Sequence, residues 1–390
     1  MNRSRTALLL GGCLGAAAFG IDAVTPVLPL LRVDFASDPG AIQWTLTLAM
    51  LGFAGGQIPA GLLSDRYGRR RVLMISLCGF VLASALASLM SELRWLLALR
   101  MAQGLSAAGM SVSARAVVRD LTRGLDAGAM MSSVTTVMAL ATVAAPLVGG
   151  LAGEVWGWRA VFIAVAGYGL IWVLPVRGLT SLAPRRRQSS PLRQLRSSAR
   201  RFLRSRTSVR AALTNGLAFA SVFAFVTVGA LLAGEFYGVD GRLLGPAMAA
   251  VPLMIVASSQ LSRVLVRRIG LVGQERVGGW LFLAAAIVML ACLGLAVPPL
   301  WLVWLGSMVA AFGFGLFVPV ATARALESQP RSAGFAAALF GTVQSTCGVV
   351  ASGLTAAIYN GSPNSLCLVM GFFSLAAAAA ALLRGPSERS

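Results

Sequence analysis

The sequence contains no histidine and few charged residues, which make up only 12% of its 390 positions. A soluble protein of ordinary composition carries about 25% charged residues, so this scarcity excludes a typical soluble domain. The five cysteines stand at no paired spacing, which favours small buried packing residues over disulfides. The chain also lacks a metal-ligand cluster and paired carboxylates on a helix face. It is therefore predicted not to be an enzyme and to bind no metal or cofactor.

Long apolar segments are what the sequence has in abundance. Hydrophobic residues make up 57% of the chain, and the mean hydropathy is +0.80. A helix needs roughly 20 apolar residues to cross a hydrocarbon layer of about 30 Å, and about twelve segments meet that need without the period-two alternation of membrane strands. They are 7–31, 41–62, 72–90, 94–118, 128–153, 159–178, 210–233, 243–265, 277–297, 300–323, 332–358 and 364–383. These segments predict an all-α membrane protein.

The positive charge follows this predicted topology. All 33 basic residues are arginines, and the formal net charge is +20. With the N-terminus assigned to the cytoplasm, 28 of the 33 arginines fall on the inner side, which places both termini in the cytoplasm by the positive-inside rule. Topology thus explains the arginines, and we expect no nucleic-acid partner.

One long polar interval, residues 179–209, separates an N-terminal bundle (1–178) from a C-terminal bundle (210–390). Five apolar residues of this interval recur at helical spacing: Leu192, Leu195, Ala199, Phe202 and Leu203. On a helix, the arginines of the interval would lie on the other faces. This pattern predicts a basic amphipathic helix on the inner membrane surface, where it would meet anionic lipid. A solvated basic loop is the alternative.

Asp22 alone, of the thirteen acidic residues, lies well inside a predicted span. It is about nine residues, or roughly 13 Å, below the outer end of that span. An ionisable group at that depth is costly unless it is protonated, paired or facing water, and burial disfavours the charged form of a carboxylate. Asp22 is therefore a candidate for proton uptake and release, or else a fixed partner of another charge.

Arg100 is the only basic residue deep in a predicted span, about six residues or roughly 9 Å below the same surface. Its guanidinium stays charged and must find an acceptor or water. We interpret Asp22 and Arg100 as facing one polar cavity, whether or not they touch. The alternative is that Arg100 extends outward to the lipid headgroups.

A short basic segment joins the second and third predicted spans: Gly61-Leu62-Leu63-Ser64-Asp65-Arg66-Tyr67-Gly68-Arg69-Arg70-Arg71. The pattern G-x-L-x-D-R-x-G-R-R-R resembles the loop between helices 2 and 3 of the major facilitator superfamily of secondary transporters. An ordinary positive-inside loop would explain the arginines but neither the acid nor the glycines.

The resemblance implies that this loop is a conformational gate. Asp65 would latch the inner ends of the two halves, cap the helix that begins near Ser332 and pair with an arginine such as Arg119.

Two further segments resemble motifs of the same family. Residues 100–108 are similar to R-x-x-Q-G-x-x-A-A, a fourth-helix motif associated with proton coupling that includes Gln103. Pro146, Gly149 and Gly150 resemble the Pro-Gly-Gly motif that is typical of exporters, although Ala145 stands where many exporters have glycine. A proline followed by glycines makes a face that another helix can approach closely, which generic helix packing would also explain.

Four more matches resemble the bicyclomycin and chloramphenicol exporters: residues 21–29, 43–57, 157–162 and 333–341. The resemblance implies a drug:proton antiporter with twelve transmembrane helices in two six-helix halves related by a pseudo-two-fold axis. It further implies a monomer in the bacterial inner membrane, driven by the proton gradient without a cofactor. The substrate would be a small molecule.

The family also implies a substrate cavity lined by aromatic residues. Candidates, besides Asp22 and Arg100, are Phe19, Pro26, Gln103, Phe219, Phe223 and Phe314. Aromatic side chains in apolar helices also face lipid or neighbouring helices, so this assignment has an alternative. The same motifs would permit efflux of a sugar or another metabolite, and a nonconducting sensor on the same fold is a third possibility.

Overall fold

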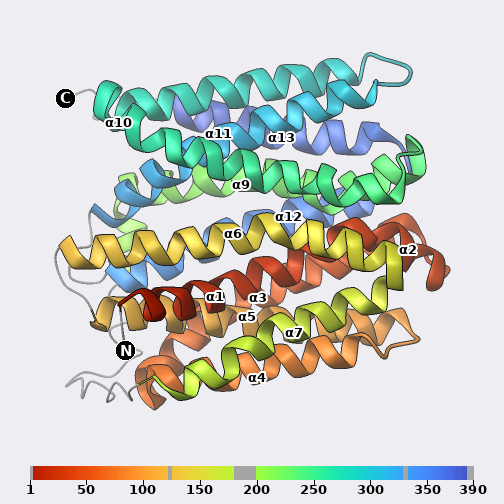
Figure 1. Cartoon of the computed structure of the whole chain (residues 1–390). Coiled ribbons are helices and arrows are strands. Elements are labelled where there is room, and N and C mark those ends of the chain that lie inside the picture. The colour runs from red at the N-terminus through yellow and green to blue at the C-terminus, as the bar shows by residue number, and fades with distance from the viewer. Residues whose placement is uncertain (1–2, 122–124, 180–198, 328–332, 384–390) are drawn as a thin grey trace. The chain divides into compact units, whose positions relative to one another are not determined.

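The computed structural model describes residues 3–121, 125–179, 199–327 and 333–383, and all regular elements in these residues are helices (Figure 1). In chain order they are α1 (Arg3–Asp22), η1 (Thr25–Val27), α2 (Leu28–Asp34), α3 (Pro39–Tyr67), α4 (Arg69–Ala87), α5 (Leu93–Leu121), α6 (Leu125–Trp156), α7 (Trp158–Arg177), α9 (Arg206–Leu231), η2 (Leu232–Phe236), α10 (Gly241–Cys292), α11 (Leu300–Glu327), α12 (Ala333–Ile358) and α13 (Pro363–Leu382). The predicted all-α class is confirmed.

Ten helical segments among the described residues are long and apolar enough to cross a membrane. One of them, α10, has 52 residues, and Gly270 with a φ of 70° and a ψ of 175° divides it into two predicted spans. A further predicted span is α5, which has 29 residues but is not among the ten, since Arg100 and Gln103 lower its hydropathy. In the described residues, each of the twelve predicted segments is therefore helical over most of its length.

The predicted loop at residues 61–71 is almost entirely helical, so the expectation of a loop was wrong. α3 continues through Asp65 to Tyr67, and Gly68 alone separates it from α4. Gly68 has a φ of 96°, which glycine adopts without a steric cost and which reverses the chain at once. Charged side chains end an apolar segment but not a helix, and Asp65 consequently lies in the last turn of α3.

The chain divides into two compact units. The first comprises Met1–Gln194 and Asp240–Ala249, and the second comprises Leu195–Val239 and Ala250–Ser390. The first unit thus includes residues 240–249, which the sequence analysis placed in the C-terminal bundle.

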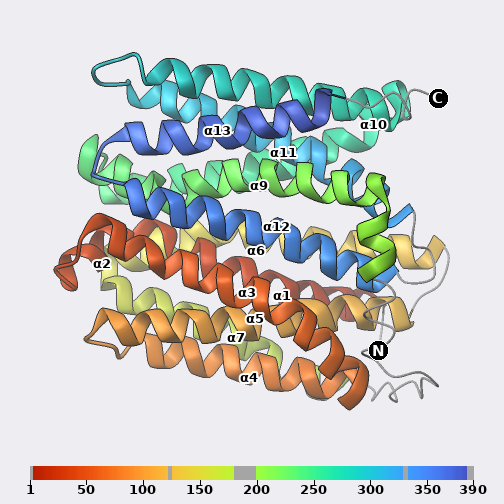
Figure 2. The ribbon, with the colours of Figure 1, turned by 180° about the vertical axis from the view of Figure 1, so that it is seen from behind.

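Each unit is a bundle with its own central helices. In the first unit α5 packs against α3 and α4, while α1 packs against α6 and α4 against α7 (Figure 1). In the second unit α9 packs against α11, α12 and α13, and Figure 2 shows α9 between α12 and α13. The residues that sequence analysis singled out in the first unit lie mainly on α1, α3, α5 and α6.

Candidate functional site

Asp22 is the last residue of α1, and the chain leaves α-helical geometry directly after it. A turn at Ala23 and Val24 leads into η1, and α2 then resumes the path, so the pieces form one candidate span, Ser4–Asp34. The Asp22 side chain is half-buried. Among the described residues its carboxylate has no hydrogen-bond or ion-pair partner. Asp22 therefore stands unpaired at a helix break within a span.

The break follows from the lost backbone hydrogen bonds around Asp22. Pro26 has no N–H to donate to the carbonyl of Asp22, four residues earlier. The N–H of Val24 donates to the carbonyl of Ile21 at 3.3 Å, so the carbonyl of Gly20 loses its helical donor too. Buried backbone carbonyls need partners, so the carbonyl of Gly20 requires a donor from outside the helix.

Arg100 of α5 supplies that donor. Its Nη1 donates to the carbonyl oxygen of Gly20 at 2.7 Å and to the amide oxygen of Gln103, and its Nε donates to the carbonyl oxygen of Thr45 at 3.0 Å. The guanidinium also lies 5.8 Å from the ring centroid of Phe162. Arg100 therefore joins the end of α1 to α3, α5 and α7.

The burial of Arg100 excludes one of the two interpretations that the sequence left open. Its side chain is 0% exposed, so the alternative in which it reaches the lipid headgroups is wrong. Within the described part of the chain no carboxylate pairs with Arg100, and the link to Asp22 is indirect, through the carbonyl two residues before it. That the two side chains face one cavity remains a prediction.

Arg100 and the first turns of α3 hold buried polar atoms that have no hydrogen-bond partner among the described residues. They are Nη2 of Arg100, Oγ1 of Thr45 and both amide atoms of Gln43. Gln103, by contrast, donates to the hydroxyl of Ser84 at 2.7 Å. Buried polar atoms without partners are rare and costly, so this group is a place where water or a polar ligand group is expected. Sequence analysis missed Thr45 as a partner of Arg100, because a backbone acceptor leaves no mark in a sequence.

The glycine face of α6 packs against the segment that follows Asp22. A Cβ atom added to Gly149 would lie 1.9 Å from the carbonyl oxygen of Ala23, and one added to Gly153 would lie 2.1 Å from Cγ1 of Val27. Pro146 lies in the same helix, one turn before Gly149. The exporter-like motif is therefore in direct contact with the break in α1.

We expect Gly149→Ala to disturb this contact. The new methyl group would force α6 away from Ala23, and overpacking of this kind costs about 1–3 kcal/mol of the free energy of unfolding. Thermal unfolding of the purified protein measures the loss. The control is Gly167→Ala in α7, where no atom lies within 4 Å of the added Cβ and stability should hold or rise. Equal stability of the two variants would contradict the close packing.

Asp65 pairs with Arg69 across the turn at Gly68. The Nε of Arg69 also donates to Oδ2 of Asp120 on α5 at 3.2 Å, so one guanidinium binds acids from two helices. Asp120 was missed by the sequence analysis because it stands far along the chain. A pairing of Asp65 with Arg119 stays a prediction, and the cap near Ser332 lies outside the described residues.

The second unit contains a comparable ion pair, in which the acid follows the glycine break and the arginine lies on the other helix. Glu275 lies shortly after the break at Gly270 and pairs with Arg324 near the end of α11. The two side chains are only 5% and 15% exposed. The acid of this pair stands on the helix that follows Gly270, where the first unit has Arg69 after Gly68.

Three of the four candidate aromatic residues meet in the second unit. Phe219 and Phe223 of α9 stack with their ring centroids 5.3 Å apart, and Phe314 of α11 lies 5.6 Å from Phe219. Phe19 belongs to the first unit, where its ring stacks on Tyr168 of α7 at 4.4 Å. That the four aromatic residues line one cavity stays a prediction.

A pair of amides lies one turn from this aromatic cluster. Asn215 of α9 donates from Nδ2 to Oε1 of Gln344 of α12 at 2.9 Å. The Oδ1 atom of Asn215 is buried and has no partner within the described part of the chain. Since Asn215 stands four residues before Phe219, the amide and the ring lie on the same face of α9. The second unit thus holds a largely buried aromatic cluster beside a hydrogen-bond acceptor that has no partner in the described residues.

Only the end of the basic linker belongs to the described residues. Residues 199–204 are helical; Phe202 is 2% exposed in a core with Phe317 and Phe340, whereas Leu203 is 70% exposed. Leu192 and Leu195 lie outside the described residues. Anionic lipid at the linker remains a prediction.

Comparisons with known proteins agree with this architecture. The bicyclomycin resistance protein homolog of Haemophilus influenzae is 29% identical over 95% of this chain and 94% of its own length. Multidrug resistance protein D of Escherichia coli is 27% identical over 96% of this chain and 95% of its own length. Among solved structures, the xylose transporter XylE from E. coli has a similar fold, with a TM-score of 0.76 at 14% identity and full coverage of both chains.

The family itself is shown by a match that covers most of the chain. Residues 9–352 match the family model described as Major Facilitator Superfamily. This confirms the resemblance seen in the sequence around Asp65, and it agrees with a multi-pass membrane protein rather than an enzyme. The chain belongs to the major facilitator superfamily of membrane transporters.

Proposed function

We propose that this transporter exports small, largely apolar compounds in exchange for protons. The observation that supports it most is the unpaired carboxylate of Asp22 at the break in α1. A carboxylate with no fixed partner can hold a proton in one state of an alternating-access cycle and release it in another. The chain has no histidine to replace Asp22 in this role.

The proposed substrate class follows from the second unit and from the relatives. The rings of Phe219, Phe223 and Phe314 suit an aromatic or apolar body, and the Oδ1 atom of Asn215 suits one hydrogen-bond donor on it. Relatives named for bicyclomycin and multidrug resistance support antibiotics of this kind. Bicyclomycin-like and chloramphenicol-like compounds are therefore the first to test.

The distribution of arginines supports a placement in the bacterial inner membrane with both termini in the cytoplasm. We further propose that the transporter works as a single chain, because each unit forms its own bundle. It requires no cofactor beyond the proton gradient.

A susceptibility panel tests the substrate class. The chain is expressed in a bacterium that lacks its own efflux pumps, and growth is scored across antibiotic classes. We expect raised resistance to chloramphenicol-like or bicyclomycin-like compounds, abolished by a protonophore in an accumulation assay. An unchanged panel with active uptake or release of a sugar would instead support metabolite efflux.

Asp65→Asn is expected to slow turnover with little effect on substrate affinity. The pair with Arg69 is partly buried, and an ion pair near the surface is worth about 0.2–1 kcal/mol. Losing it shifts a two-state equilibrium by up to about fivefold, in favour of the inward-open state. Labelling of single-cysteine reporters on both faces measures the shift, with Glu92→Gln, in an exposed pair with Arg94, as control. Unchanged labelling and turnover would mean that the segment acts only as a topological signal.

A further inference from the structure

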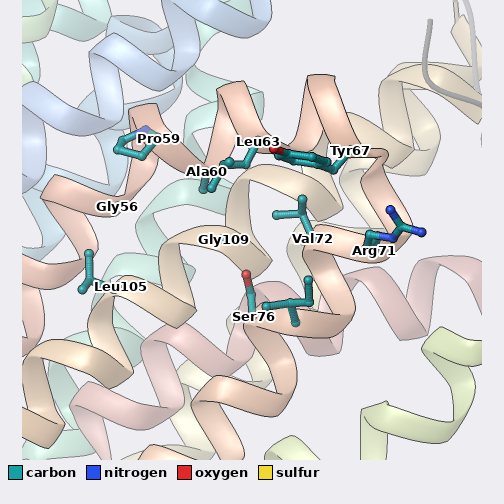
Figure 3. Close-up of a pocket in the computed structure, with 11 residues that line it drawn as sticks. Gly56, Pro59, Ala60, Leu63, Tyr67, Arg71, Val72, Ser76, Leu105 and Gly109 are labelled. Carbon is teal, nitrogen blue, oxygen red and sulfur yellow. The ribbon is translucent and has the colours of Figure 1, made fainter.

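An apolar groove opens on the first unit between α3, α4 and α5 (Figure 3). Its volume is about 450 Å³. The lining residues are Gly56, Pro59, Ala60, Leu63, Tyr67, Arg71, Val72, Ile75, Ser76, Leu105 and Gly109. Arg71 is the only charged side chain among them, and it lies at the same end of the groove as Tyr67 in Figure 3. The groove is therefore apolar along its length and carries one positive charge at one end.

The length of the groove matches one leaflet of a bilayer. Its lining on α3 runs from Gly56 to Tyr67, and at 1.5 Å per residue this is roughly 16 Å. Half of a hydrocarbon layer of about 30 Å is about 15 Å. Leu63 and Ile75 on its walls are 46% and 65% exposed, so the groove is open to the membrane side. One acyl chain of a single leaflet fits these dimensions.

The three consecutive arginines after Gly68 differ in their partners. Arg69 binds Asp65 and Asp120, and Arg70 donates to the backbone carbonyl of Arg177. Arg71 is exposed, and in the described residues it has no hydrogen bond or ion pair. Arg71 is therefore the one guanidinium of the three with no partner in the described residues, which leaves all of its donors available to a ligand.

We propose that this groove binds one anionic phospholipid of the leaflet that faces the basic turns. The acyl chain lies along α3 between α4 and α5, and the phosphate accepts hydrogen bonds from the guanidinium of Arg71. A guanidinium matches phosphate in geometry as well as in charge. Tyr67, 46% exposed beside it, is the residue type that favours the headgroup level. The site lies on one unit alone and does not depend on the transported compound.

Native mass spectrometry of the full chain tests the headgroup contact. The protein is extracted from vesicles of phosphatidylethanolamine with a minor fraction of phosphatidylglycerol, and bound phosphatidylglycerol is titrated. Arg71→Gln should weaken the first binding step about fivefold, the effect of one arginine near the surface. Arg268→Gln, which changes an exposed arginine outside the groove, should leave it unchanged. Equal binding by Arg71→Gln and the wild type overturns the proposal.

Two further experiments distinguish a bound lipid from other ligands. Ala60→Phe fills the groove from α3 and should remove the tightly bound phosphatidylglycerol, whereas Leu82→Phe on the exposed side of α4 should not; thermal unfolding verifies that both variants fold. Glycerol 3-phosphate, the headgroup chemistry without acyl chains, should not displace the lipid. Displacement by glycerol 3-phosphate, or equally tight binding of phosphatidylethanolamine, overturns the assignment to an anionic lipid.

Discussion

Replacing Asp22 by asparagine is expected to abolish proton-driven export while the protein still inserts in normal amounts. Asparagine has nearly the same shape, and it removes a charge that is costly within a membrane, so the fold should not suffer. What it removes is the ability to bind a proton. In an efflux-deficient bacterium the variant should therefore confer no more resistance than an empty vector, and accumulation of labelled drug should match that of cells without the transporter.

A second acid provides the matched control for Asp22→Asn. Asp38 precedes α3, is exposed and makes no side-chain capping hydrogen bond. Asp38→Asn changes the same charge and should leave resistance intact. Wild-type resistance in the Asp22→Asn strain, with membrane levels verified by immunoblot, would remove Asp22 from the coupling mechanism.

Arg100→Ala is expected to eliminate export and to destabilise the first unit. The carbonyl of Gly20 has no helical donor, and Arg100 supplies the hydrogen bond that it needs. A hydrogen bond to a charged group contributes about 1.5–3 kcal/mol, and the bond to Thr45 is lost as well. The variant also no longer buries a charge, and this gain offsets part of the lost stability. Removing one partner nevertheless leaves the others buried and unsatisfied, so a net loss of stability is expected.

The Arg100→Lys variant distinguishes the hydrogen bonds that Arg100 makes from the effect of its positive charge. Lysine keeps the charge but lacks the planar fork that reaches Gly20, Thr45 and Gln103 together. We expect intermediate thermal stability, lowered export and a changed pH profile of the remaining transport. Arg94→Ala is the control, because its pair with Glu92 lies on the surface with the arginine side chain 74% exposed. An unchanged pH profile and stability in both Arg100 variants would show that Arg100 does not hold the break.

The apolar segments predicted the helices well because the length of a span is set by the thickness of the bilayer. Their ends were predicted less well. The segment 41–62 became α3, Pro39–Tyr67, since a helix continues into charged residues until Gly68 reverses the chain. The positions of Asp22 and Arg100 within spans were also visible in the sequence, because ionisable residues are rare there.

The partners of these residues were not predictable from the sequence. Arg100 binds the backbone carbonyls of Gly20 and Thr45, and every residue has such a carbonyl. Only the proline at position 26 hints that carbonyls near Asp22 lack helical donors. Likewise, the stacking of Phe19 on Tyr168 depends on the packing of α1 on α7, which hydrophobic spacing alone does not specify.

Substrate-induced proton flux in proteoliposomes tests the central claim most directly. The purified chain is reconstituted with a pH-sensitive dye inside the vesicles, and a compound that the susceptibility panel identifies is added outside. For the wild type we predict proton movement opposite to the compound, and for Asp22→Asn we predict no proton movement although the compound still exchanges with labelled compound inside. Proton movement of wild-type size in the Asp22→Asn vesicles, or transport by the wild type without any proton movement, would contradict the account.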